Sequence, residues 1–115
     1  MTPSRDTESY FDRIASHAEA KAWAGNVDKW EVIEPLFDDV PAAAKILECG
    51  AGTGMYTMKM LERNYRVTAV DLSREALRVS REIAERRGLG KLLATVQGKF
   101  EQAILELDEA FDVVA

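Results

Sequence analysis

Short apolar runs alternate with amphipathic helical patterns along this chain. Apolar residues recur at helical spacing over residues 10–18 and again over residues 27–37, which predicts two N-terminal helices. The run Ile46–Cys49 then predicts a short buried strand that enters a glycine-rich turn. A helix containing Met58, Met60 and Leu61 is expected after the turn. The pattern therefore predicts a strand, a tight turn and a helix in succession.

The rest of the chain repeats this order. Residues 66–70 predict a second strand that ends at Asp71, and Ser73 is the expected N-cap of a helix that stops at Gly88. Residues 92–96 predict a third strand, residues 101–107 a short helix and residues 111–115 a fourth strand. Because such alternation is typical of parallel sheets, the predicted fold class is α/β, with a doubly wound parallel sheet and N-terminal helices.

The last apolar run ends at Val114 and Ala115 with no turn or polar tail after it. We therefore expect a sheet truncated after its fourth strand, with an exposed edge through which copies of the chain could associate. The expected organisation is a helical lid segment over residues 1–40 and one half domain over residues 41–115 that carries the ligand site.

Composition limits the classes of partner. With 115 residues, of which 47% are hydrophobic and 30% charged, the chain fits one globular domain. No apolar run approaches the roughly 18 residues of a membrane span, and no signal pattern opens the chain. The single cysteine, Cys49, permits neither an internal disulfide nor a cysteine-rich zinc site, so we expect a cytoplasmic protein without a metal. A net charge of −5 disfavours nonspecific nucleic-acid binding, which leaves a small molecule as the expected partner.

The glycine-rich turn carries the main chemical signal. Gly50, Gly52 and Gly54 alternate with other residues between a strand and a helix. Glycines permit positive φ and remove the Cβ atoms that would hold a ligand away, while unpaired N–H groups at a helix start favour an anionic group. The turn therefore predicts a nucleotide-like cofactor.

The spacing and charge of the turn discriminate between cofactors. Dinucleotide-binding loops place their third glycine one position later, where this chain has Met55. Glu48 would repel a pyrophosphate but could pair with the cationic α-amino group of a methionine moiety. An NAD-dependent oxidoreductase domain stays open as an alternative, as does a non-catalytic cofactor-binding fragment that assembles through its unfinished sheet.

Asp71 supplies the second signal. It stands at the end of a predicted strand, roughly twenty residues beyond the glycines, where one carboxylate can accept hydrogen bonds from both vicinal ribose hydroxyls. NAD and S-adenosylmethionine sites share this feature, so Asp71 indicates an adenosine group without identifying the rest of the ligand.

These two segments resemble motifs of a known family. The turn from Glu48 to Gly54 resembles motif I of class I S-adenosylmethionine-dependent methyltransferases, and residues 67–73 resemble the acidic motif that follows it. Residues 111–115 are similar to the family's fourth strand. Residues 10–15 are similar to the opening of small-molecule methyltransferases such as the quinone-biosynthesis group. The resemblance implies a Rossmann-like fold, S-adenosylmethionine as cofactor, S-adenosylhomocysteine as product and a small-molecule methyl acceptor.

The resemblance also implies roles for particular residues. Glu48 and the glycines would hold the methionine end, Asp71 the ribose, and Leu72 would pack against the adenine. Many relatives have Gly-Asp-Ala after the third strand, where this chain has Gly98, Lys99 and Phe100, so the carboxylate that reads the adenine amino group is missing. The candidate cofactor-binding residues are Glu48, Gly50, Ala51, Gly52, Gly54, Asp71, Leu72 and Phe100.

No catalytic residue is identifiable. Cys49 follows a core strand with no neighbouring histidine, so we interpret it as a small packing residue rather than a nucleophile. We interpret Trp23 and Trp30 as packing anchors and His17 as a surface or packing residue. Methyl transfer by direct displacement gains mostly from alignment of the partners, so the acceptor determines which side chains are needed.

Overall fold

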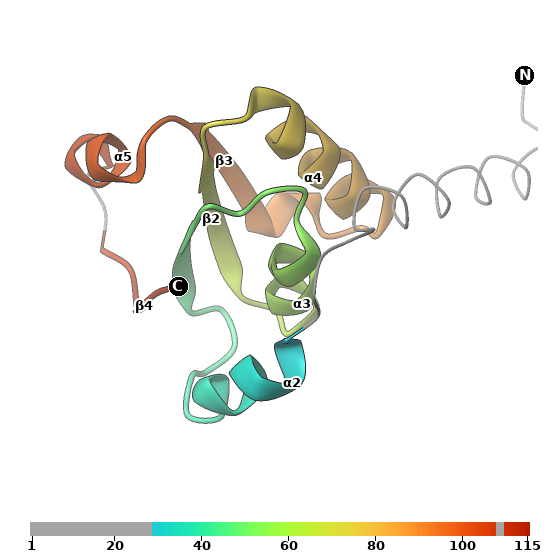
Figure 1. Cartoon of the computed structure of the whole chain (residues 1–115). Helices are drawn as coiled ribbons and strands as arrows, with labels where there is room; N and C mark the ends of the chain where they lie inside the picture. Colours follow the sequence, from blue (N-terminus) through green and yellow to red (C-terminus); the bar gives the residue numbers. More distant parts are fainter. Residues whose placement is uncertain (1–28, 108–109) are drawn as a thin grey trace, which may run out of the picture.

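The computed structural model describes residues 29–107 and 110–115, which form one parallel sheet with helices on both faces (Figure 1). The strands are β1 (Lys45–Cys49), β2 (Arg66–Asp71), β3 (Leu93–Gln97) and β4 (Val113–Val114). The α-helices are α2 (Trp30–Ile33), α3 (Met55–Glu62), α4 (Arg74–Arg86) and α5 (Phe100–Glu106), and the 3₁₀ helices are η1 (Glu34–Phe37) and η2 (Gly90–Leu92). The predicted doubly wound α/β fold is confirmed.

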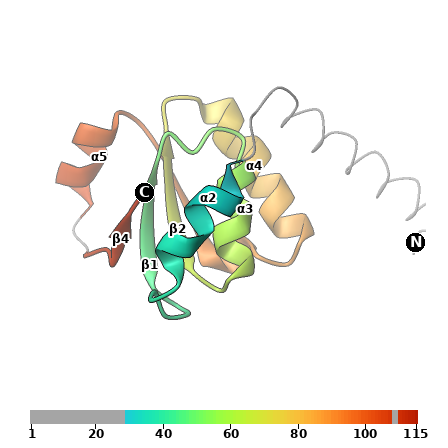
Figure 2. The ribbon, with the colours of Figure 1, turned by 60° about the horizontal axis from the view of Figure 1, so that its bottom comes forward.

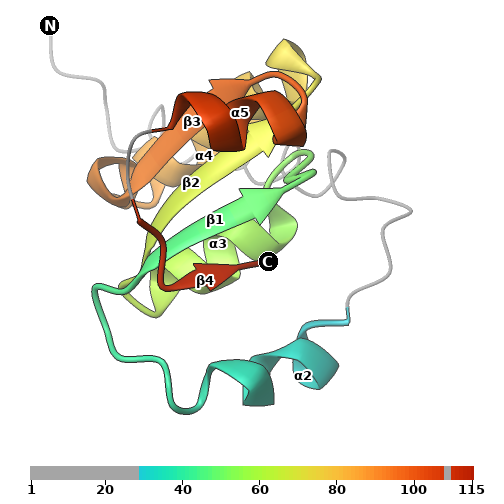
Figure 3. The same ribbon diagram turned by 90° about the vertical axis from the view of Figure 1, so that its left-hand side faces the viewer.

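Helices α3 and α4 cover one face of the sheet, and α5 covers the other (Figure 3). Successive side chains of a strand point to opposite faces. Ile46 and Val67 accordingly join the core beneath α3 and α4, whereas Leu47 and Val70 pack against Ala103 of α5. This alternation places the side chain of Glu48, which follows Leu47 in β1, on the face that α3 covers.

The strand order is β3-β2-β1-β4, so the order reverses beside β1. Cys49 is in register with Val70, and Asp71 with Gln97, so the carboxyl ends of the strands lie along one edge. In open α/β sheets, ligands bind outside this edge at the point of reversal. The topology therefore predicts a ligand site at the loops that follow β1, β2 and β3.

The segment before the sheet differs from the single helix predicted over residues 27–37. Within residues 29–37, the part of this segment that the structure describes, only Trp30–Ile33 is α-helical, and the chain then tightens into η1. Pro35 explains the change, because it has no N–H for an α-helical hydrogen bond and its ring would clash with a backbone carbonyl of the preceding helical turn. Trp30 stacks on Phe37 with ring centroids 5.7 Å apart, which confirms its interpretation as a packing anchor. Helix α2 lies beside α3 (Figure 2).

The fourth strand is shorter than predicted. It was expected over residues 111–115, whereas β4 spans Val113–Val114. Asp112 explains the difference at its start, because its side-chain Oδ2 takes the place of a backbone carbonyl and accepts the N–H of Lys45 at 2.8 Å. The N–H of Asp112 also donates to the carbonyl of Lys45 at 2.7 Å. The segment thus joins the sheet through a mixed side-chain and backbone ladder.

Some predictions lie outside the described residues. The helix over residues 10–18, His17, Trp23 and most of the lid assignment over residues 1–40 fall in the range 1–28. Within the ranges 29–107 and 110–115, no helix is long and apolar enough to cross a membrane. Association of copies through an exposed sheet edge stays a prediction.

Candidate functional site

The loop between β1 and α3, residues 50–54, carries the three predicted glycines. Gly50, Gly52 and Gly54 have φ values of +67°, +59° and +96°, as their alternating spacing suggested. A Cβ at Gly54 would lie 2.7 Å from Oγ of Ser80 on α4, so this position requires glycine on two counts. At Gly50 and Gly52 a Cβ would enter open space, which leaves the outer side of the loop accessible to a ligand.

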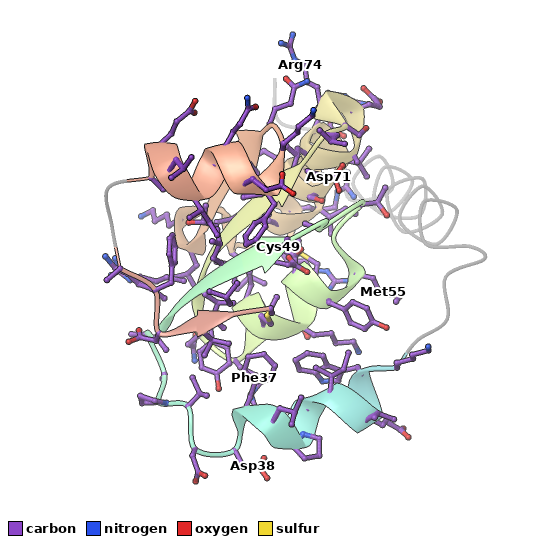
Figure 4. All side chains as sticks on the ribbon, turned by 60° about the vertical axis from the view of Figure 1, so that its left-hand side comes forward. Phe37, Asp38, Cys49, Met55, Asp71 and Arg74 are labelled. Atoms are coloured by element: carbon purple, nitrogen blue, oxygen red, sulfur yellow. The ribbon has the colours of Figure 1, made fainter. Side chains whose placement is uncertain are left out.

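Asp71 ties the end of β2 to this loop, at the edge where Figure 4 also shows Cys49. Its Oδ2 accepts the N–H of Gly52 at 2.8 Å, and its Oδ1 accepts the N–H of Ser73 at 2.8 Å. An ionised carboxylate offers about four acceptor positions, so each oxygen retains capacity for another donor. Asp71 therefore orders the loop and can still accept hydrogen bonds from two hydroxyl groups.

Four backbone N–H groups of the loop donate to other groups of the protein. The N–H groups of Gly50 and Ala51 donate to the carbonyl of Val70 at 2.8 and 3.2 Å, and that of Gly54 donates to Ala51 at 3.3 Å. The N–H of Gly52 is used as described above. These four donors are therefore used within the protein, because β2 and the loop itself supply the acceptors. The expectation that N–H groups at the start of the helix favour an anionic group stays a prediction.

A cleft of about 660 Å³, which we call the Asp71 cleft, opens between the ends of β2 and β3. Leu72 is 67% exposed and Phe100 is half-buried, and together they give the cleft apolar walls suited to a flat ring. The lining residues are Gly50, Val70, Asp71, Leu72, Gly98, Lys99, Phe100 and Glu101. Four of the predicted cofactor-binding residues thus meet in one cavity.

Two charged residues follow the third strand in this cleft. Lys99 stands where many relatives have a carboxylate, as noted from the sequence. Glu101 brings a carboxylate into the same cleft two residues later, in the first turn of α5. Acidic residues are common in first turns because they interact favourably with the helix dipole, so the sequence did not mark Glu101 as a ligand residue.

Glu48 is a buried carboxyl, 6% exposed, on the face of β1 that α3 covers. It accepts a hydrogen bond from Oγ1 of Thr57. Burial raises the pKa of Glu48 to about 7, with the Asp71 carboxylate adding to the rise and the Thr57 hydrogen bond opposing it. The sequence suggested a permanent charge, whereas near neutral pH the two protonation states are close in free energy, and a nearby cation would favour the ionised one.

A second cavity of about 300 Å³, which we call the aromatic pocket, shares Gly50 with the Asp71 cleft. It is lined by Trp30, Ile33, Phe37, Glu48, Cys49, Gly50, Ala51, Tyr56, Met60 and Ala115. Figure 4 shows Phe37 pointing toward the sheet and Asp38 pointing away from it. Three elements, α2, η1 and α3, contribute the aromatic rings, which no sequence motif connected.

Cys49 is half-buried in the wall of the aromatic pocket. Burial raises the pKa of its thiol, and the neighbouring Glu48 carboxylate raises it further. Because the thiolate is the nucleophilic form, a raised pKa opposes a role in covalent catalysis. The structure agrees with a packing role for this residue.

Two buried hydroxyl groups near the loop were missed. Thr57 and Ser80 are both 0% exposed. Oγ of Ser80 lies 3.1 Å from the carbonyl oxygens of Gly52 and Ala76. Each hydroxyl stands at helical spacing among buried apolar residues, Thr57 with Leu61 and Ser80 with Ile83. A polar residue within an apolar helical stripe was the signal that could have identified them.

Comparison with known proteins agrees with this geometry. Residues 46–115 match the family model described as a methyltransferase domain. The chain belongs to this methyltransferase domain family. The putative methyltransferase YqeM of Bacillus subtilis (strain 168) is 32% identical over 69 residues, which are 60% of this chain and 24% of YqeM. This methyltransferase domain thus matches about a quarter of the length of that relative.

Two solved structures share the fold. The C-terminal domain of precorrin-6Y C5,15-methyltransferase from Rhodobacter capsulatus has a TM-score of 0.68 at 16% identity, covering 81% of this chain and 51% of that one. Coclaurine N-methyltransferase bound to N-methylheliamine and S-adenosylhomocysteine has a TM-score of 0.62 at 22% identity, covering 73% and 25%. The Rossmann-like fold of this methyltransferase domain is therefore confirmed, whereas likeness to the quinone-biosynthesis group stays a prediction.

Proposed function

We propose that this chain forms the S-adenosylmethionine-binding part of a methyltransferase that acts on a small-molecule acceptor. The observation that carries the proposal is the position of Asp71, which orders the glycine loop while its carboxylate lines an open cleft. Family membership supports it, as does the S-adenosylhomocysteine in the coclaurine N-methyltransferase structure. When bound, S-adenosylmethionine supplies an electrophilic methyl group on a sulfonium.

The chemistry of the Asp71 cleft fits the adenosine group. The Asp71 carboxylate retains acceptor capacity for two ribose hydroxyls. Leu72 and Phe100 offer apolar surface to the adenine ring, and Glu101 offers an acceptor for its amino group. At Gly50 and Gly52 the missing side chains leave space that a bound ligand can fill.

The aromatic pocket fits the methionine moiety of the cofactor and the methyl acceptor. Its Glu48 carboxyl suits the cationic amino group of the methionine moiety, since a nearby cation stabilises the ionised form. The rings of Trp30, Phe37 and Tyr56 favour an apolar acceptor, and about 300 Å³ is the size of a small ligand site. Gly50 joins the two cavities, so one cofactor could span them. These residues bind and align the partners, which is the main source of rate in a direct displacement.

The NAD-dependent alternative fits less well. Met55 begins α3 where a dinucleotide loop would have its third glycine, and Glu48 would lie near a pyrophosphate. A cytoplasmic location and the absence of nucleic-acid and membrane partners stay predictions from the sequence.

Isothermal titration of the chain with S-adenosylhomocysteine, with NADH as the comparison ligand, tests the proposal. We expect micromolar binding of S-adenosylhomocysteine and weaker binding of NADH. Asp71→Asn should weaken the binding of S-adenosylhomocysteine at least about tenfold, because a hydrogen bond to a charged group contributes about 1.5–3 kcal/mol. Asp38→Asn is the matched control. Asp38 is exposed, directly follows η1 and points away from the sheet, so this variant should bind S-adenosylhomocysteine with the wild-type affinity. Preferential binding of NADH would contradict the proposal.

A further inference from the structure

Thr57 and Glu48 form a buried hydrogen-bonded pair between α3 and β1. Thr57 is 0% exposed, and its hydroxyl donates to Oε1 of Glu48. Glu48 lines the aromatic pocket, whereas Thr57 lines neither that pocket nor the Asp71 cleft. Thr57 can therefore influence a ligand in these two cavities through Glu48.

A hydroxyl donor has two effects on such a carboxylate. It favours the ionised form, because only the ionised group is purely an acceptor. It also restricts the orientation of the carboxylate, since threonine is β-branched and has few χ1 choices in a helix. The first effect opposes that of burial, which is the largest cause of the raised pKa of Glu48.

The other groups around Glu48 do not replace this hydroxyl. Asp71 on β2 is the charged neighbour and raises the pKa of Glu48. The titratable side chains that share the pocket are Cys49 of β1 and Tyr56 of α3, and the residues contributed by α2 and η1 do not titrate. Among these contacts, Thr57 alone favours the ionised carboxylate.

We propose that Thr57 is a positioning residue that favours the ionised form of Glu48 and orients its carboxylate toward the cationic amino group of the bound methionine moiety. The inference rests on the proposed function, because it requires that moiety to occupy the aromatic pocket beside Glu48. It also implies that binding of an amino-bearing ligand strengthens as pH rises through the titration of Glu48.

Two ligands separate this role from general packing. S-adenosylhomocysteine carries the amino group, whereas 5′-methylthioadenosine has the same adenosine and lacks the amino acid. Thr57→Val removes the hydroxyl at nearly constant volume, and Thr57→Ser retains it. Affinities are measured by isothermal titration between about pH 5.5 and pH 8, on either side of the Glu48 pKa of about 7.

We expect Thr57→Val to weaken S-adenosylhomocysteine about tenfold near neutral pH, in line with the loss of one hydrogen bond to a charged group. The pH at which affinity reaches its plateau should move upward in this variant, because Glu48 then ionises at higher pH. The affinity for 5′-methylthioadenosine should not change, and Thr57→Ser should remain within about threefold of the wild type. If Thr57→Val does not fold, Thr57→Ala gives the same comparison.

Two results would overturn the inference. One is a hydroxyl-free variant that binds S-adenosylhomocysteine with the wild-type affinity and pH profile. The other is an equal loss of both ligands, which a packing defect would cause. Failure of the wild-type chain to bind S-adenosylhomocysteine is a different result, since it would overturn the proposed function and the inference together.

Discussion

Oδ2 of Asp71 lies 2.8 Å from the backbone nitrogen of Gly52, so the second strand holds the glycine loop that follows the first. The loop is therefore ordered by a side chain from another βα unit before any ligand arrives. Preorganisation of this kind reduces the entropy that binding must overcome. It also means that substitution of Asp71 affects both stability and ligand binding.

Replacement of Asp71 by alanine should lower the free energy of unfolding by about 1–3 kcal/mol. The N–H groups of Gly52 and Ser73 would each lose a carboxylate acceptor. Urea denaturation measures the loss, and Asp38→Ala, at an exposed position, should change stability by no more than about 0.5 kcal/mol. Equal stabilities for the two variants would show that Asp71 does not hold the loop.

Glu48 should make the stability of the free chain depend on pH. The folded-state pKa is about 7 against a reference value of 4.5, so the folded state binds more protons between these values. Stability should therefore fall as pH rises from about 4.5 to about 7 and then level off, with a loss on the order of 3 kcal/mol. Glu48→Gln cannot ionise and should remove this dependence in urea denaturation at about pH 5 and pH 8.

A matched control for the pH experiment is Glu106→Gln, at an exposed position in the last turn of α5. This variant should retain the pH dependence of the wild type. If Glu48→Gln also retains it, another group is responsible for the dependence.

Gly54→Ala should destabilise the chain more than Gly88→Ala. Both positions have left-handed backbone, with φ values of +96° and +74°, but only at Gly54 would the new Cβ meet an atom, Oγ of Ser80 at 2.7 Å. We expect losses of about 1–2 kcal/mol for Gly88→Ala and about 1–3 kcal/mol more for Gly54→Ala. Adding Ser80→Ala should recover part of the extra loss, and simple additivity in thermal denaturation would argue against the contact.

Tyr65→Phe should weaken the attachment of the segment before β1. Tyr65 is 1% exposed, and its hydroxyl donates to the carbonyl oxygen of Val40 at 2.9 Å. The carbonyl oxygen of Phe37 is a second acceptor, 3.3 Å from the same hydroxyl. Its loss should cost about 1–2 kcal/mol in urea denaturation. Affinity for S-adenosylhomocysteine should stay the same, because Tyr65 lines neither cavity. A large drop in that affinity would show that the segment helps to hold the cofactor.

Local patterns in the sequence were sufficient for the first two βα units. Hydrophobic periodicity and the alternating glycines predicted β1, the loop and α3, because strand burial and left-handed backbone depend on nearby residues. Ser73 was predicted as an N-cap, and its side chain accepts the N–H of Ala76. Asp71 was predicted beside the loop because parallel strands bring their carboxyl ends to one edge.

The sequence by itself determined the order of elements, the glycine loop and the two carboxylates that follow β1 and β2. Only the tertiary structure decided what those groups can do. It joined Gly52 to Asp71 and Glu48 to Thr57, and it built the aromatic pocket from residues as far apart as Trp30 and Ala115. The physical reason is that donor occupancy and the charge of a buried carboxyl depend on which distant groups pack around it and exclude water.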